Sequence, residues 1–434
     1  MSKKLWLNPA LDRAKAGSPA VGATSRWLGR RALGETVLTN GALLGVGALT
    51  GIVAARLLGP AGRGQVAVAI GVVAVLWPVA ALGLQQAAGY RLAQSRHEAP
   101  QAVGLAFVVS LLVGGAMTVV AWVVVTAVVR DGAARTAIDI GLLAVPFAIL
   151  NALLVGVLQG LRLGRRFNAA RLSTPLVYAV LLMGLVIHRR DATAVNVMWV
   201  YWAASDAGAV VAVVFLPPEA RRPARPGRRF RGAMVRYGMY VNLSSLGYLI
   251  NRQLPVVLVG AVSSAADAGQ YAVGLGYALP VSVVAVALAL HTLPDIAAEP
   301  DARAQQAIAR QRVRSGLFGT LPLACGAVIA APTLIPFAFG ARFSPAVPVA
   351  RVLVLGQAAL GISFLLSEVS RGLGRPGIPA IAEWTGVFAT AAVLPAALTL
   401  GSLTGAAAAL IGVYAVVIAI LLAGTRRTFW SGGT

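Results

Sequence analysis

The residues of this sequence that are most able to bind an anion lie inside long apolar segments. Arg252 is flanked by Asn251 and Gln253 in the apolar run 237–262. Inside a membrane a charged side chain costs at least ~2.5–3.5 kcal/mol on insertion scales, so it usually has a ligand or an ionic partner. The planar guanidinium of arginine fits phosphate oxygens well. We therefore predict that Arg252, with Asn251, binds phosphate or another acidic group, the alternative being a structural ion pair with Asp206.

Two further candidates are one helical turn apart. Trp202 and Asp206 are separated by four residues in the apolar run 196–216, so they share one face of a helix. Asp206 is a candidate protonation site, or else the counter-ion of Arg252. Aromatic residues near the ends of apolar runs usually anchor a helix at the membrane interface. Among them, Trp202 is the one that we expect to stack on a sugar ring.

Four other positions add charge near the ends of apolar runs. Glu368 and Arg371 are three residues apart, a spacing that predicts a local ion pair on one helix face. Arg91 is expected either to meet a phosphate group or to reach the lipid headgroups, and Glu383 only to face the membrane interface. The sequence predicts no catalytic residue, cofactor or metal site, because its three histidines are scattered and it has one cysteine.

The composition indicates an integral membrane protein. Of 434 residues 58% are apolar and 12% are charged, and the mean hydropathy is +0.79. Soluble proteins have about 45–50% apolar and about 25% charged residues, so an ordinary soluble enzyme is excluded. A membrane-spanning helix needs about 20 mostly apolar residues. Twelve such runs are present, at 37–56, 65–84, 103–129, 137–160, 172–188, 196–216, 237–262, 270–293, 315–339, 349–370, 378–400 and 402–425.

The distribution of basic residues between these runs predicts the orientation. With the N-terminus in the cytoplasm, 28 of the 37 Lys and Arg residues fall on the cytoplasmic side, including four at 162–171, and seven fall on the opposite side. Lys and Arg favour cytoplasmic loops. We therefore expect a multi-pass protein of the plasma membrane with both termini cytoplasmic. The net charge of +23 is then explained by membrane lipids, without nucleic acid as a partner.

A basic stretch divides the chain into two halves. We expect a cytoplasmic tail at 1–36, a six-helix lobe at 37–216, a basic linker at 217–236, a second six-helix lobe at 237–425 and a short tail at 426–434. Because each half has an even number of runs, any repeat is parallel, with an axis along the membrane normal. The sequences GQVAV at 64–68 and GQYAV at 269–273 lie at equivalent places in the two halves. The fold predicted is all-α, with about 12 transmembrane helices in two lobes.

Several short motifs occur in the order found in one known family. The stretch ARLLGPAGRG at 55–64 resembles a hairpin with the pattern ARxLGPxxxG, and VRYG, GQYAV, FGARF and LGRP follow at 235–238, 269–273, 339–343 and 373–376. This pattern resembles the polysaccharide and O-antigen flippases, the oligosaccharide transporter branch of the MOP superfamily. The resemblance covers about residues 30–427. MATE drug exporters and lipid II flippases are other branches of that superfamily.

The resemblance implies a two-lobed transporter and no enzyme activity. Its substrate would be a lipid-linked oligosaccharide, usually carried on undecaprenyl pyrophosphate, which passes from the cytoplasmic to the outer face through a central, often cationic cavity. A polymerase or glycosyltransferases of the same pathway are implied as partners, and we expect a monomer. One departure concerns the seventh run, where many relatives have an acidic residue and this chain reads NRQL at 251–254. An ion-coupling role for that position is therefore in doubt.

Other functions stay open as alternatives. The closest are a MATE-type cation or drug antiporter and a lipid II flippase. A membrane glycosyltransferase would need acidic residues in an outer loop to hold a metal, and only four aspartates lie in or beside these short loops. A non-transporting scaffold for polysaccharide synthesis is a further class. An ATP-driven pump is excluded within this chain because its only lysines are at positions 3, 4 and 15, so no phosphate-binding loop lysine is present.

Overall fold

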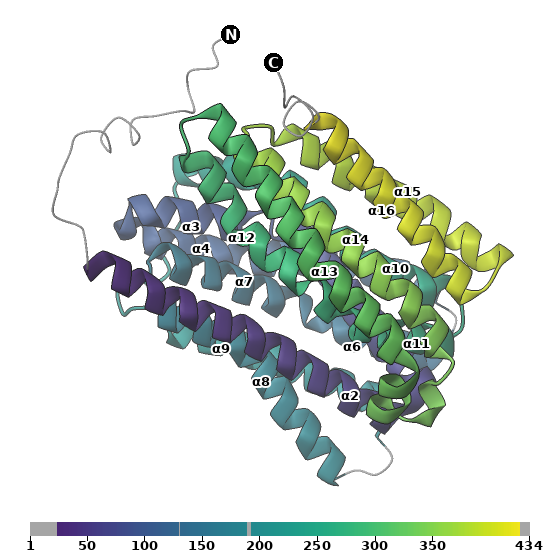
Figure 1. The fold of residues 1–434 in the computed structure, drawn as a ribbon. Coiled ribbons are helices and arrows are strands. Elements are labelled where there is room, and N and C mark those ends of the chain that lie inside the picture. Colours follow the sequence, from purple (N-terminus) through teal and green to yellow (C-terminus); the bar gives the residue numbers. More distant parts are fainter. Residues whose placement is uncertain (1–23, 130, 189–191, 426–434) are drawn as a thin grey trace.

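A computed structural model describes residues 24–129, 131–188 and 192–425, and all of their regular elements are helices (Figure 1). The N-terminal half contains α2 Thr24–Ala80, α3 Leu84–Gln94, η1 Arg96–Glu98, α4 Ala99–Val108, η2 Val109–Gly114, α5 Gly115–Val128, α6 Gly132–Leu143, α7 Val145–Gly160, α8 Gly164–His188 and α9 Ala194–Val214. The C-terminal half contains α10 Arg228–Val262, α11 Ala265–Ala278, η3 Leu279–Ser282, α12 Val283–Ala298, α13 Ala302–Phe339, η4 Ala341–Phe343, α14 Ala346–Gly372, α15 Gly377–Leu400 and α16 Leu403–Gly424. The tail predicted at 426–434 and most of that at 1–36 lie outside the described residues.

The helices supply the twelve transmembrane segments expected from the sequence. Eleven helical stretches among the described residues are long and apolar enough to cross a membrane. The first of them, Leu38–Ala80, holds two segments because the helix kinks at Gly59, where φ is +66°. The two segments lie side by side after this break, because Gly47 and Gly51 of the first segment line the same cavity as Ala67 and Gly71 of the second, so the predicted hairpin is confirmed. Pro60 follows at once, and proline is well suited to the first turn of a helix, so the second segment begins before residue 65.

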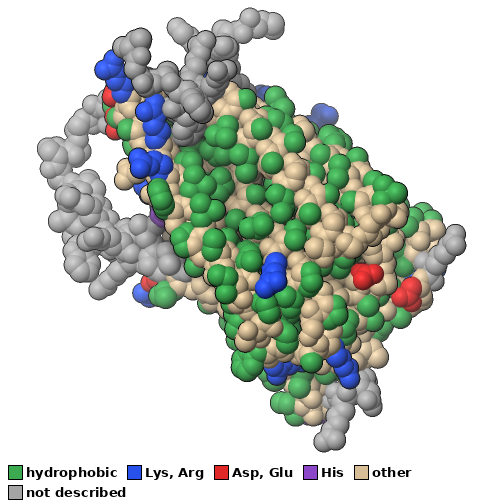
Figure 2. All heavy atoms as spheres, turned by 45° about the vertical axis from the view of Figure 1, so that its right-hand side comes forward, with side chains coloured by type: hydrophobic (Ala, Val, Ile, Leu, Met, Phe, Trp, Pro, Cys, Tyr) green, Lys and Arg blue, Asp and Glu red, His purple; other side chains and the backbone are tan. Residues whose placement is uncertain are grey.

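The two halves form two lobes, each with its own core, and α2 of the first half also packs into the core of the second through Ala55 and Ala67. The purple-to-teal helices of the first half lie together in Figure 1, and the green-to-yellow helices of the second half lie beside them. Residues such as Ile149, Leu154 and Met198 are fully buried in the first lobe, and Tyr271 and Leu360 are buried in the second. The lipid-facing character of the exterior is plain in Figure 2, where hydrophobic side chains dominate the visible face and charged ones are few.

The basic stretch at 217–236 is tied closely to the first lobe. The backbone N–H of Ala224 donates to the carbonyl oxygen of Pro100 at 2.9 Å. A Cβ on Gly104 would lie 2.0 Å from the carbonyl oxygen of Ala224, so the stretch packs directly on α4. From Arg228 onward the chain is already helical, and the first turns of α10 bury Phe230 and Met234 in the core of the first lobe. Helix α10 therefore starts on one lobe and ends in the other.

The lobes meet most closely at the two glycines of the sequence repeat. A Cβ on Gly64 of α2 would lie 1.8 Å from the carbonyl oxygen of Ala265, and a Cβ on Gly269 of α11 would lie 1.9 Å from that of Pro60. The contact is therefore reciprocal, with each glycine placed against the backbone of the other helix. Nearby, Arg56 donates to two carbonyl oxygens at the end of α13, at 2.7 and 2.6 Å. Unpaired carbonyls at a helix C-terminus commonly accept bonds from basic side chains.

Candidate functional site between the two lobes

A cavity of about 210 Å³ lies between the lobes. Its walls come from both segments of α2 in the first lobe and from α10, α11 and α13 in the second. Small and apolar side chains form most of the lining. The polar side chains in it are those of Arg63 and Gln253, which belong to different lobes. A ligand in this space would therefore contact both lobes.

Arg63 is a lining residue that sequence reasoning missed. It was counted among the basic residues of a short outer loop, but the structure places it in the second segment of α2. Its Nε is buried and has no hydrogen-bond partner among the described residues. The sequence signal was weak because the neighbours of this side chain are distant in the chain: Tyr178 of α8 interacts with it electrostatically, and Gln253 of α10 lines the same cavity.

The three consecutive polar residues of α10 point to different surroundings. Successive side chains are separated by about 100° around a helix. Gln253 lines the interlobe cavity, whereas Asn251 is buried inside the second lobe. Arg252 interacts with Tyr248, one turn earlier on the same helix, and the ring of Tyr248 packs on Phe364 with 4.6 Å between centroids. Tyr248 is also close enough to Glu383 for an electrostatic interaction, so Arg252 on one side and Asn251 on the other adjoin the same Tyr248–Glu383 cluster.

Glu383 is buried, which corrects the expectation that it faces the membrane interface. Its side chain on α15 is 1% exposed. The Nδ2 of Asn251 donates to Oε2 of Glu383 at 3.1 Å and to its backbone oxygen at 2.9 Å. The hydroxyl of Ser367 on α14 donates to Oε1 at 3.4 Å. Three helices of the second lobe therefore hold one carboxyl group through neutral hydrogen-bond donors.

The packing of α10 on α15 explains why this contact is possible. A Cβ on Gly386 would lie 2.8 Å from Nδ2 of Asn251 and equally close to Val417. Only glycine leaves room for the asparagine side chain at this point. Directly after Ser367 on α14, Glu368 forms with Arg371 the ion pair predicted from their spacing, and the two side chains are 11% and 17% exposed. Arg371 is also close enough to act electrostatically on Glu383.

The remaining predicted residues of the first lobe have other neighbours. Arg91 forms two hydrogen bonds with the carboxylate of Glu98, at 2.6 and 2.8 Å. These bonds raise the pKa of the Arg91 guanidinium and occupy the donors that a phosphate would use. Trp202 packs edge to face against Trp199 and Phe147, with 5.6 and 6.5 Å between ring centroids.

Asp206 does not pair with Arg252. It lies on α9 of the first lobe, and no ion pair or hydrogen bond of its side chain occurs within the described residues. The structure thus divides the predicted residues between the two lobes: Asn251, Arg252 and the Glu368–Arg371 pair lie around Glu383 and Tyr248, and Arg91, Trp202 and Asp206 lie in the other lobe. The roles predicted for them in binding stay predictions.

Comparison with known proteins gives one family and one fold. The family described as polysaccharide biosynthesis protein matches residues 53–348. Among solved structures, an inward-facing multidrug resistance MATE transporter of the MOP superfamily is 15% identical, with a TM-score of 0.77 over 89% of this chain and 94% of that chain. A lipid II flippase MurJ in an inward closed conformation is 14% identical, with a TM-score of 0.73 over 90% of this chain and 87% of that chain.

A second MATE structure has the same fold. An outward-facing MATE transporter covers 91% of this chain and 95% of its own, at 16% identity, but with a TM-score of 0.63. At such low identities these structures establish the fold alone. A search of curated protein sequences finds no match.

Proposed function

Because this chain belongs to the polysaccharide biosynthesis protein family, we propose that it is a flippase for a lipid-linked oligosaccharide. It moves the sugar headgroup, attached to a polyprenyl pyrophosphate, from the cytoplasmic to the outer face of the plasma membrane. The observation that carries the proposal is the interlobe cavity, which has the guanidinium of Arg63 on one lobe and the amide of Gln253 on the other. The headgroup of such a substrate combines phosphate with sugar hydroxyls, which these two groups can bind.

The proposed mechanism is alternating access without covalent chemistry. The lipid tail stays in the bilayer while the headgroup passes between the lobes, which must move apart because the cavity of about 210 Å³ between them is too small for a whole oligosaccharide. With both termini in the cytoplasm, the Gly64–Gly269 contact lies toward the outer face and closes the cavity there. Opening to the outside then requires α2 to separate from α11.

Two arginines have proposed roles in this cycle. Arg63 attracts the anionic part of the headgroup, because it is a lining cation whose Nε has no partner in the part of the chain described. Arg252, which lies beside Tyr248, contributes a second positive charge on the other lobe. We propose that the protein acts as a monomer and delivers its product to a polymerase or glycosyltransferase of the same pathway.

The test is the distribution of lipid-linked oligosaccharide between the membrane faces in a deletion strain. We expect the intermediate to accumulate on the cytoplasmic face and surface polysaccharide to be lost. Reintroduced wild type restores both, and Arg63→Gln restores them poorly at equal protein levels. Unchanged lipid-linked pools together with new sensitivity to cationic dyes would refute the proposal and favour a drug exporter. Accumulation of lipid II in place of the oligosaccharide would assign the chain to peptidoglycan precursors.

A further inference from the structure

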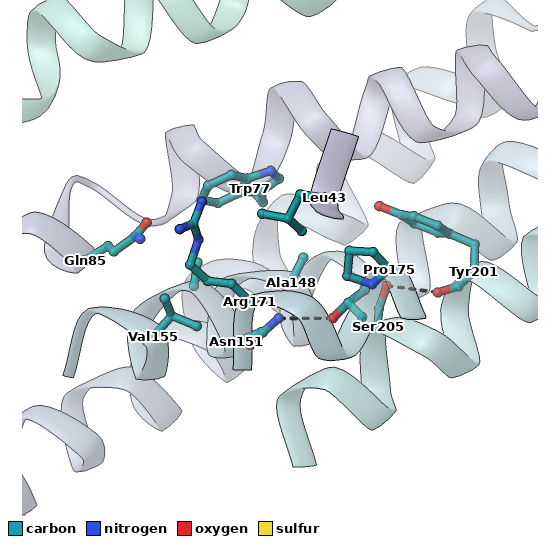
Figure 3. Close-up of a pocket in the computed structure, with 12 residues that line it drawn as sticks. Leu43, Trp77, Gln85, Ala148, Asn151, Val155, Arg171, Pro175, Tyr201 and Ser205 are labelled. Atoms are coloured by element: carbon teal, nitrogen blue, oxygen red, sulfur yellow. Dashed lines mark hydrogen bonds between the residues drawn. The ribbon is translucent and has the colours of Figure 1, made fainter. Parts of the chain in front are cut away.

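A second cavity lies inside the first lobe, apart from the cavity between the lobes. Its volume is about 290 Å³, and its walls come from α2, α3, α7, α8 and α9 (Figure 3). The described residues that line it are all different from those that line the interlobe cavity. Ligand pockets for drug-sized molecules measure roughly 300–1,000 Å³. This cavity is thus large enough for an anionic group with one attached sugar ring, but not for a whole oligosaccharide.

The one charged side chain among the lining residues described is Arg171. The sequence suggested that Arg171 belongs to a cytoplasmic loop, but α8 begins at Gly164, so the residue lies about two turns inside the helix. Its side chain extends from α8 into the cavity (Figure 3). Nη2 donates to Oδ1 of Asn40 at 2.9 Å, and the guanidinium carbon lies 5.3 Å from the ring centroid of Phe167.

The charge of Arg171 is not neutralised by the protein. Neither an ion pair of Arg171 nor an acidic lining residue occurs in the described part of the chain. Asn40 is a neutral amide and accepts a bond from one of the five guanidinium N–H donors. A purely structural tie between α8 and α2 could be made by a neutral side chain, whereas a cation within a membrane-spanning helix carries an insertion cost. The missing negative charge is therefore expected from a ligand.

The opposite walls offer groups that bind hydroxyls. On α7, Nδ2 of Asn151 donates to the hydroxyl of Thr174 at 3.1 Å, while Oδ1 of Asn151 is buried with no partner among the residues described. A Cβ on Gly208 would lie 1.9 Å from that same hydroxyl, so a glycine there is required for the arrangement. Gln85 contributes a further amide from α3, and the rings of Trp77 and Tyr201 form flat apolar walls.

We propose that this cavity of the first lobe is an anion site that binds the phosphate-bearing end of the lipid-linked substrate. Arg171 holds the pyrophosphate oxygens in its planar fork, and the amides and Trp77 contact the first sugar. The proposal rests on the proposed flippase function and adds a second binding place to it, beside the cavity at Arg63. The substrate would engage the first lobe at Arg171 before or after it contacts both lobes at the interface.

The test measures binding directly, without transport. The full-length protein in detergent is mixed with undecaprenyl pyrophosphate or with the uncharged alcohol undecaprenol, and the retained lipid is counted by native mass spectrometry. We expect wild type to retain the pyrophosphate lipid about tenfold or more over the alcohol, since bonds to charged groups are the strong ones. Arg171→Gln loses this preference. Arg165→Gln removes the same charge from a position of the same helix that is 89% exposed, and this variant should still prefer the pyrophosphate lipid.

A second variant distinguishes loss of the binding site from misfolding of Arg171→Gln. Gln85→Glu leaves Arg171 in place but adds a negative charge to the cavity wall, and it should also lower retention of the pyrophosphate lipid. Equal retention by wild type, Arg171→Gln and Gln85→Glu would overturn the proposal. If equimolar inorganic pyrophosphate displaces the lipid, the ligand is a free phosphate compound and not a lipid-linked one. If phosphatidylglycerol displaces it, the cavity is a site for ordinary membrane lipid, and the proposal is wrong.

These results are separable from those on the proposed function. Unchanged lipid-linked pools in the deletion strain would refute the flippase function whatever the binding result. If the lipid-linked pools are unchanged but Arg171 still determines lipid binding, the flippase function is wrong. If the pools change but Arg171 does not affect binding, the anion site is wrong.

Discussion

At the scale of single residues, the polar groups buried in the lobes depend on small neighbours. Asn251 reaches the carboxyl group of Glu383 only because Gly386 leaves space beside it, and Thr174 reaches Asn151 beside Gly208. Buried polar groups that lose a partner cost free energy comparable to a lost hydrogen bond. The positions of these polar side chains therefore depend on glycines, which have no side chain to fill the space.

The first prediction concerns Gly386. In Gly386→Ala the new methyl group would lie 2.8 Å from Nδ2 of Asn251 and from Val417, so one of them must move. Overpacking of this kind costs about 1–3 kcal/mol, and the thermal unfolding temperature of the purified protein should fall. Gly412→Ala on α16 is the control, because nothing lies within 4 Å of its Cβ. An equal shift in both variants would contradict the packing described here.

The second prediction concerns Glu383. Glu383→Gln keeps an oxygen that can accept from Asn251, so its stability should stay close to that of wild type. Glu383→Ala removes both side-chain oxygens and leaves a cavity, with an expected loss of about 2–4 kcal/mol. Chemical unfolding of the two variants measures the difference. If both variants are equally stable, the carboxyl group is not held by the bonds from Asn251 and Ser367.

At the scale of elements, the hydropathy pattern predicted every membrane-spanning segment but not the helix ends. Length and apolar composition are local properties, so all twelve segments could be read from the sequence. The helices continue into polar residues, as α8 does around Arg171 and α10 does from Arg228. Of the buried charges, Glu383 and Arg63 were misjudged because their burial is produced by helices distant in sequence. The Glu368–Arg371 pair was predictable because its partners share one helix.

The third prediction concerns the kink of α2. Gly59 has a φ of +66°, a conformation that other residues adopt only with strain. Gly59→Ala should therefore destabilise the protein by about 1–3 kcal/mol, which thermal unfolding can measure. Gly45→Ala lies in the same helix with open space around its Cβ, and replacing a helical glycine there should be neutral or slightly stabilising. Equal stability of Gly59→Ala and wild type would show that the turn between the two segments of α2 does not depend on the left-handed conformation of residue 59.

At the scale of the whole molecule, the two lobes are joined by helix α10, which packs in both of them. The first turns of α10 are packed in the first lobe and its later turns in the second. The stretch before it is bonded to α4 and cannot act as a loose tether. A rocking motion of the lobes must therefore bend α10 along its length, and it must break the reciprocal contact of α2 with α11.

The fourth prediction tests whether the contact of α2 with α11 closes the interlobe cavity on the outer side. Gly269→Leu would push α11 away from Pro60 and hold the cavity open on the outer side. The readout is modification of a cysteine placed at Gly276, which lines the interlobe cavity, in a Cys325→Ser background. A membrane-impermeant maleimide added outside should label this cysteine slowly in the parent protein and several-fold faster with Gly269→Leu. Equal labelling from outside would show that the seal lies elsewhere.

The reciprocal contact at Gly64 and Gly269 also has the form of an interface between two copies of one chain. In a two-fold symmetric dimer, residue i of one copy meets residue j of the other and j meets i, so any substitution appears on both sides at once. In this single chain the two sides differ at the position before the glycine, which is Arg63 in the first half and Ala268 in the second. A symmetric dimer could not place a single cation beside its axis, whereas one chain with two different halves can.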